Sequence, residues 1–250
     1  FADGTTYDMY EHNISSSNTT TSGASNLYDS TFFFVTSDLR VYKVLDNNGG
    51  SAYSGAEPTS ESNSAFALGG YVLKYMYKIT ASEAAKFATT DYIPVSTDST
   101  VSGAATDGAI ESISVTAGSG YTDGTYYAAV FGDGTSQGTS SGAVVRITVT
   151  SGSLVSFGLT AGTDTTIHAA GSGYTFGTVN LDTVFSDSSL SSSTTIGSGT
   201  GGAVDVIISP KGGHGNDAVT ELGGHFVMNA VTLTQAEGDD ITVSNDFRQI

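Results

Sequence analysis

The sequence predicts a mainly β protein with a few short helices, in which a β-sandwich-like core domain carries an inserted, internally duplicated β-module. Three observations predict this class. Charged residues make up 13% of the 250 residues, about half the proportion in an ordinary soluble domain, and 32 glycines accompany long serine and threonine stretches. Apolar and polar residues alternate in several short runs, which is typical of strands. The tetrapeptide Gly-Ser-Gly-Tyr occurs at 118–121 and again at 171–174.

Residues 1–95 are expected to form the first part of the core domain. Residues 15–25 consist of Ser, Thr, Asn, Gly and Ala, which predicts a long exposed loop. Two runs rich in β-branched and aromatic residues, 31–36 and 39–45, are separated by two residues, the spacing of a tight hairpin. The polar stretch at 47–64 is expected to be a second loop.

A strand is predicted at 71–79, where large apolar residues fall at alternate positions with two lysines between them. This pattern predicts a half-buried strand that places Tyr71, Tyr75 and Tyr77 on one face and both ammonium groups on the other. We interpret the three tyrosines as core or subunit-interface residues, and stacking on sugars is the alternative use.

A short helix is expected directly after this strand. Thr80 and Glu83 have the spacing of a capping box, in which the two side chains satisfy backbone amides at the start of a helix. The helix should continue to about Ala88. Pro94 disfavours helical backbone at the residue before it, so the first segment should end near Val95.

Residues 96–202 are expected to form the inserted β-module. Each Gly-Ser-Gly-Tyr copy is followed by a strand-like run, a Ser/Thr/Gly loop and a strand that opens with Gly-Ala-Val, at 142–149 and at 202–208. A repeated order of this kind indicates an internal duplication. The sequence therefore predicts two related β-units.

Residues 203–250 are expected to form the second part of the core domain. A glycine-rich turn is followed by a short helical turn that ends at Gly223 and Gly224. The run 225–234 is expected to be an inner strand with both faces at least partly covered, and 237–240 a solvated turn. The turn motif consists of Pro210, Lys211, Gly212, Gly213, His214, Gly215 and Asp217.

Charge and composition exclude several classes of function. The net charge is −17, so the chain would repel nucleic acid and anionic membranes. Without cysteine there is no thiolate for zinc and no thiol nucleophile. The apolar runs are far shorter than the roughly 18 residues of a membrane helix. We therefore expect neither nucleic-acid nor membrane partners.

No motif predicts catalysis, a metal or a cofactor. The letters G-x-S-x-G occur at 134–138 and 138–142, but a serine- and glycine-rich loop precedes the strand there, not the strand and helix of a nucleophile elbow. Residues 212–217 fit one copy of a calcium-binding repeat, which needs neighbouring copies to complete its sites. The four histidines lack metal-ligand spacing. The sequence thus predicts a protein that is not an enzyme and has no small-molecule substrate.

Two blocks resemble the baseplate wedge protein of T-even-type contractile-tailed bacteriophages. The first runs from Gly69 to Val95 and includes Gly-Tyr-Val-Leu-Lys-Tyr-Met-Tyr. The second contains Ser-Pro-Lys-Gly-Gly-His-Gly at 209–215 and ends with Asn-Asp-Phe-Arg-Gln-Ile at 245–250. The hairpin at 39–45 with Asn-Asn-Gly-Gly at 47–50 is similar to the segment before the first block. The resemblance covers about half of the chain, and the duplicated middle is a departure from it.

The resemblance implies a structural subunit of the virion, assembled in the host cytoplasm. Such a subunit is largely β, dimerises within each wedge and binds other wedge proteins around the tail hub. Because Phe1 is not preceded by methionine, we expect the sequence to be a piece of a longer chain. The alternative function is that of a tail fibre, another appendage or an extracellular adhesin that recognises host polysaccharide. A glycoside hydrolase would need two paired carboxylates, for which the sequence gives no pattern.

Overall fold

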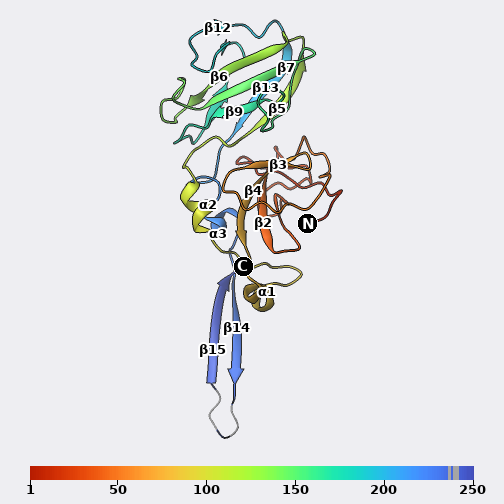
Figure 1. The fold of residues 1–250 in the computed structure, drawn as a ribbon, viewed down its shortest axis with the longest axis vertical. Helices are drawn as coiled ribbons and strands as arrows, with labels where there is room; N and C mark the ends of the chain where they lie inside the picture. Colours follow the sequence, from red (N-terminus) through yellow and green to blue (C-terminus); the bar gives the residue numbers. More distant parts are fainter. Residues whose placement is uncertain (236–237, 239–241) are drawn as a thin grey trace.

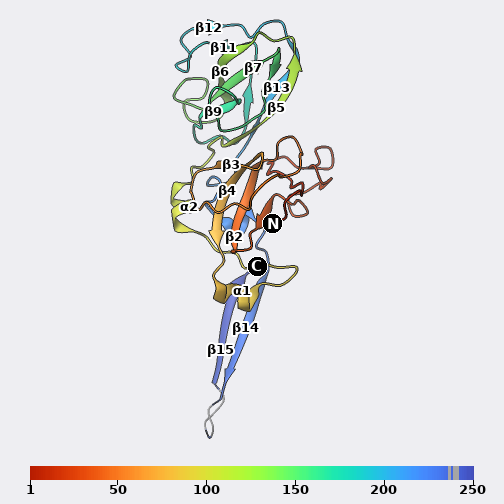
Figure 2. The same ribbon diagram turned by 45° about the vertical axis from the view of Figure 1, so that its right-hand side comes forward.

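The molecule consists of three parts that follow one another along its long axis (Figures 1 and 2). The computed structural model describes residues 1–235, 238 and 242–250. A β-module lies at one end, a four-stranded sheet with its loops and helices occupies the middle, and a two-stranded hairpin projects at the other end. Strands dominate the described residues and the three helices found there are short, so the predicted mainly β class is confirmed.

The middle part is built on one antiparallel sheet. Its strand order is β1-β2-β4-β3, and the predicted hairpin over 31–36 and 39–45 is present as β1 and β2, with Leu39 in the turn at a φ of 69°. The strands are β1 (Phe33–Val35), β2 (Arg40–Asp46), β3 (Phe66–Leu68) and β4 (Tyr71–Lys78).

The strand predicted at 71–79 is present as β4, but the prediction that it is half-buried is wrong. β4 lies between β2 and β3, and every side chain from Tyr71 to Tyr77 is buried. An irregularity in the pairing of β2 with β4 lies at Met76, since Tyr75 and Tyr77 pair with adjacent residues of β2. Such a bulge reverses the alternation of side chains. Tyr77 therefore packs with a different core cluster from Tyr71 and Tyr75.

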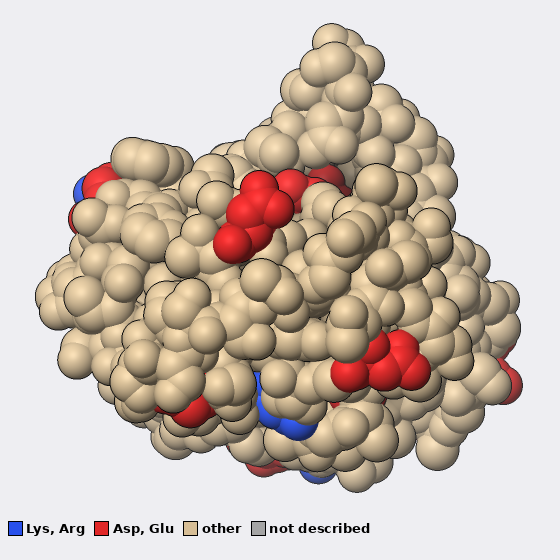
Figure 3. Space-filling model, turned by 90° about the horizontal axis from the view of Figure 1, so that it is seen from above, with Lys and Arg blue, Asp and Glu red and all other residues tan. Residues whose placement is uncertain are grey.

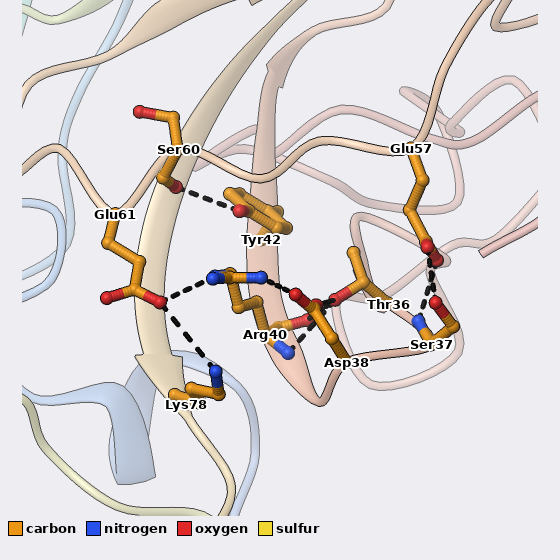
Figure 4. A network of polar contacts seen from close by, with 9 residues as sticks. All are labelled: Thr36, Ser37, Asp38, Arg40, Tyr42, Glu57, Ser60, Glu61 and Lys78. Carbon is orange, nitrogen blue, oxygen red and sulfur yellow. Dashed lines mark hydrogen bonds and ion pairs between the residues drawn. The ribbon is translucent and has the colours of Figure 1, made fainter.

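Polar contacts at the edge of this sheet hold a loop in place (Figure 4). Ser37, in the β1–β2 turn, donates its backbone N–H to Glu57 at 2.7 Å. Arg40 of β2 donates its Nε–H to Glu61 at 2.6 Å, and Lys78 Nζ lies 3.9 Å from the same carboxylate. These exposed pairs fix the path of the loop over 57–61 and each contributes little free energy.

The three helices begin at capping residues. The capping box of Thr80 and Glu83 forms with both of its hydrogen bonds, and α1 (Ala81–Phe87) ends at Ala88 as predicted. Helix α2 (Ser99–Ala104) was not predicted from the sequence, and Asp98 caps it through the amides of two residues. Helix α3 (Ala218–Glu221) is capped by Asp217, the last residue of the predicted turn.

The β-module is a sandwich of two sheets. The larger has the order β12-β11-β6-β7-β8, with β10 beside β6 and β9 beside β7, and the smaller pairs β5 with β13. Apolar side chains from both sheets form one core cluster. β13 runs beyond the boundary predicted at residue 202. The strands are β5 (Ser112–Ser119), β6 (Gly124–Gly132), β7 (Val144–Thr150), β8 (Ser153–Leu154), β9 (Thr166–Ala169), β10 (Gly177–Val179), β11 (Val184–Phe185), β12 (Ser193–Thr194) and β13 (Thr200–Ile207).

The two repeats of the module are interlocked. The hydroxyl of Tyr121, in the first Gly-Ser-Gly-Tyr, accepts the N–H of Gly202, which opens the second Gly-Ala-Val, at 2.9 Å. The hydroxyl of Tyr174, in the second copy, accepts the N–H of Ala143 in the first Gly-Ala-Val at 3.1 Å. A Cβ on Gly118 would lie 2.3 Å from the nitrogen of Gly202. Glycine is therefore needed where one repeat crosses the other.

The prediction of an inner strand at 225–234 is wrong. Among the described residues, β14 (Val227–Thr234) pairs with β15 (Thr242–Gln249) and with no other strand, and the two form a separate hairpin. Most of its side chains are exposed because no second layer from the described part of the chain covers the hairpin. The alternating residues of 225–234 lie on two different faces of the hairpin. One face packs toward α1 and the other faces solvent. Of the predicted turn, only residue 238 lies within the described residues.

Candidate protein interface

The predicted turn motif lies over buried charges in the middle sheet. Lys211 is exposed, whereas Gly213, His214 and Gly215 are buried. A Cβ on Gly213 would lie 2.5 Å from the carbonyl oxygen of Thr106. The glycines therefore let the turn lie close against the segment that leads into the β-module.

Two buried lysines lie beneath this turn. Lys43 of β2 and Lys74 of β4 are cross-strand partners, so their side chains emerge on the same face of the sheet. Lys43 Nζ lies 2.8 Å from the carboxylate of Glu221 in α3, and Lys74 Nζ lies 3.1 Å from that of Glu111. Lys43 Nζ also lies 3.9 Å from the ring centre of Tyr10. Each ammonium group is thus neutralised by a glutamate from a distant segment.

His214 completes the buried cluster without a hydrogen bond of its own. Its ring is fully buried and lies edge-on to Tyr10 at 5.0 Å. Neither ring nitrogen has a partner among the described residues. Burial, together with Lys43 and Lys74, holds the pKa of His214 well below its usual range. The imidazole is therefore neutral and fills space beside the ring of Tyr10.

Glu221 joins the turn motif to the sheet. Its Oε1 accepts the backbone N–H groups of Gly215 at 2.8 Å and Asp217 at 3.3 Å, while Oε2 accepts from Lys43. Because this carboxylate is buried, a ligand in solvent has no direct access to it. The described residues hold no group of three or more His, Asp or Glu side chains able to bind a metal. We assign the cluster a structural role.

The three predicted aromatic residues are part of the core. Tyr71, Tyr75 and Tyr77 are at most 3% exposed. The Tyr71 hydroxyl donates to the carbonyl of Ser51 at 2.6 Å, and the Tyr77 hydroxyl donates to that of Pro94 at 3.0 Å. Burial raises the pKa of Tyr75 to about 12. None of the three rings presents a face on which a sugar could stack.

One face of the projecting hairpin is apolar and uncovered. Register places paired residues of β14 and β15 on the same face, and alternate pairs on opposite faces. Five apolar residues share one face, and each is more than half exposed. No side chain of this face within 227–234 and 242–249 is charged. The five residues, called here the apolar hairpin face, are Val227, Val231, Leu233, Val243 and Phe247.

The opposite face of the hairpin is fixed to α1. Lys86 Nζ lies 3.0 Å from the carboxylate of Asp246, and Arg248 Nη2 lies 3.0 Å from that of Glu83. These partly exposed pairs add little stability. Together they orient the hairpin, whose strands of eight residues are each about 27 Å long. Figure 2 shows the hairpin projecting away from the middle part.

An aromatic groove lies at the base of the hairpin. It has a volume of about 340 Å³, and its lining includes Tyr28, Tyr92 and Phe226, each at least 43% exposed. The rings of Tyr92 and Phe226 lie edge to face at 6.0 Å. Val95 lines both this groove and a smaller hollow that reaches Phe247. The groove and the apolar hairpin face are therefore adjacent.

The exposed apolar hairpin face was not predicted from the sequence, although its residues follow a strand-like alternation. Val227, Val231 and Leu233 all lie at odd-numbered positions, on one side of the two-residue repeat, which is the pattern of a strand with one apolar face.

No helix among the described residues is long and apolar enough to cross a membrane. Comparisons of the sequence with protein families and with curated proteins, and of the chain with solved structures, found no match.

Proposed function

We propose that this chain is a structural subunit of a protein assembly and binds its neighbours through the apolar hairpin face. The observation that carries the proposal is that five apolar side chains are exposed together on a projecting arm. Contiguous exposed apolar surface on a soluble protein marks an interaction site. Complete burial of one such side chain contributes about 1.5–3 kcal/mol. Five of them can offset a substantial part of the cost of association.

The charge distribution supports a protein partner at this face. The chain carries 25 acidic residues against 8 basic ones, so copies repel one another at long range. The apolar hairpin face carries no charge within the described strands. Contact there avoids burial of an unpaired carboxylate, which would be costly. A second copy of the chain and other uncharged surfaces are both compatible occupants.

The resemblance to phage baseplate wedge proteins supports a specific assembly. The two resembling blocks, far apart in sequence, are neighbours in the fold: Lys74 of the first lies beneath the turn of the second, which holds His214. The β-module, which the resemblance does not cover, lies at the far end of the molecule (Figure 1). We therefore propose a baseplate wedge subunit that pairs with a second copy and with other wedge proteins in the virion tail.

The adhesin alternative loses its proposed aromatic platform, because Tyr71, Tyr75 and Tyr77 are buried. The end of the molecule seen in Figure 3 shows scattered acidic groups on a largely uncharged surface. Neither the burial of these tyrosines nor this largely uncharged surface favours glycan recognition over protein assembly.

Incorporation of variants into phage tails tests the proposal. Val231→Asp places a charge on the apolar hairpin face, whereas Thr232→Asp places it on the opposite face of the same strand. We expect the wild-type chain and Thr232→Asp to enter purified tail particles and Val231→Asp to be lost from them. Equal incorporation of both variants, or absence of the wild-type chain from the particles, would contradict the proposal.

A further inference from the structure

A cleft with a mainly apolar lining and a few ionisable side chains lies between the β-module and the middle part. It has a volume of about 420 Å³, which lies within the range of ligand sites. Lys74 and Ala65 line it from the middle part, while Arg146 of β7 and His168 of β9 line it from the module. Glu111, at the entrance to the module, is also in the lining. Both parts of the molecule thus contribute ionisable side chains to one hollow.

Arg146 is unusual within the module. It is the only lysine or arginine between 96 and 208, a range that holds nine acidic residues. Despite this excess, no carboxylate among the described residues forms an ion pair with it. The nine acidic residues are Asp98, Asp107, Glu111, Asp123, Asp133, Asp164, Asp182, Asp187 and Asp205.

The guanidinium of Arg146 is only loosely held by the protein. Nη2 donates to Thr125 Oγ1 at 3.4 Å, a long hydrogen bond. Nη1 is buried and has no acceptor among the described residues. A buried donor without an acceptor is costly and rare in folded proteins. Arg146 lies at the wall of the cleft, and its guanidinium lacks an acceptor. This indicates that the cleft can receive a group that accepts hydrogen bonds from the guanidinium.

The surrounding residues favour an anion of low charge. Across the strands, Arg146 pairs with Tyr127 and Thr166, which carry no charge. Lys74 supplies a second positive charge, and Glu111, 3.1 Å from it, removes one. The lining therefore has one net positive charge when His168 is neutral. The Glu111 carboxylate would repel a dianion more strongly than a monoanion.

We propose that this cleft binds a carboxylate group, which accepts hydrogen bonds from the guanidinium fork of Arg146. The planar fork matches the two oxygens of a carboxylate, and such paired hydrogen bonds are among the strongest in proteins. The carboxylate can belong to a small organic acid or to an acidic side chain of a neighbouring protein. The proposal is independent of the apolar hairpin face, which lies at the opposite end of the middle part (Figure 1).

Side-chain NMR of the full chain tests this assignment. Arginine Nε–H signals are resolved from backbone amides, and the chain has three arginines. Sodium acetate, or glutamate blocked as its N-acetyl and α-methylamide derivative, is added at constant ionic strength, with sodium chloride as the reference. We expect a saturable shift of the Arg146 signal that chloride does not reproduce.

Two variants and a competing anion complete the test. Arg146→Lys keeps the charge but removes the fork. In this variant binding is followed at the backbone amides of Thr166 and His168, which also line the cleft, and the affinity for acetate should fall at least tenfold, whereas Arg248→Lys, in the hairpin, should leave it unchanged. Tighter binding of blocked glutamate than of acetate identifies a protein side chain as the source, and equal binding identifies a small acid. Absence of a saturable shift, an unchanged affinity in Arg146→Lys, or tighter binding of inorganic phosphate would overturn the proposal.

Discussion

Lys43 lies directly opposite Lys74 on neighbouring strands, and both side chains are buried. Like charges in this position repel one another unless each has a partner. Glu221 supplies one partner from 178 residues along the chain, and Glu111 supplies the other. The turn that contains His214 closes over the pair. The two lysine charges on the β-strands are therefore neutralised by glutamates from other segments, and these ion pairs connect those segments to the sheet.

Removal of one partner of the buried ion pair should be more harmful than removal of both. Lys43→Met leaves the carboxylate of Glu221 buried without its cation, and we expect a loss of about 3–5 kcal/mol in the free energy of unfolding. Adding Glu221→Gln should recover part of this loss, because the amide oxygen can still accept the N–H of Gly215. Urea unfolding measures both. A double variant less stable than Lys43→Met would contradict this account.

His214 should make the protein less stable in acid. Its pKa is depressed in the folded chain by burial and by two lysines, whereas the unfolded chain takes up a proton near pH 6.5. The contribution of this group is therefore fully present above pH 6.5 and declines as the pH falls. His214→Met should reduce the slope of unfolding free energy against pH between 6 and 5, by up to about 1.4 kcal/mol per pH unit. An unchanged slope would show that the imidazole is protonated in the folded protein.

Asp46, in contrast to His214, should make the protein less stable as the pH rises. Burial raises the pKa of its carboxyl from 3.8 to about 6, although the N–H of Asn48 donates to it. The unfolded chain releases the proton first as the pH rises, so stability falls between about pH 4 and 6. Asp46→Asn keeps an acceptor for Asn48 and should stabilise the protein at pH 7 by up to about 3 kcal/mol. Thermal unfolding at pH 3.5, where little difference is expected, is the control.

The interlocked repeats predict unequal effects for two equivalent substitutions. Tyr174→Phe removes the acceptor of the buried N–H of Ala143, so a loss of about 1–3 kcal/mol is expected. Tyr121→Phe should cost less, because Gly202 is only half-buried and water can replace the hydroxyl. Tyr127→Phe is the control, since its hydroxyl forms no hydrogen bond with the described residues. Equal losses in all three variants would contradict this explanation.

Local signals made parts of the fold predictable from the sequence. The capping box of Thr80 and Glu83 acts within one helical turn, and the β1–β2 hairpin depends on two adjacent runs. Helix α2 was missed because its sequence, which includes Gly103, has a low helical propensity. Its start depends on the cap at Asp98 and on burial of Val101.

Features that depend on long-range contacts could not be predicted from the sequence. The burial of Lys74 depends on Glu111 and on the turn over it, neither of which lies on the same strand. The reversed side of Tyr77 depends on a bulge that periodicity alone does not reveal. The apolar residues of β14 were visible as an alternating pattern. Periodicity identifies an apolar face but does not say whether the same chain covers it.

Cryo-electron microscopy of assembled tail particles tests the central claim most directly, because it locates the chain and its neighbours together. The account predicts paired copies around the tail hub, with Val231 and Leu233 of the apolar hairpin face covered by a neighbouring protein. A chain found at the end of a fibre, or a hairpin whose apolar face remains in solvent in the assembled particle, would contradict it.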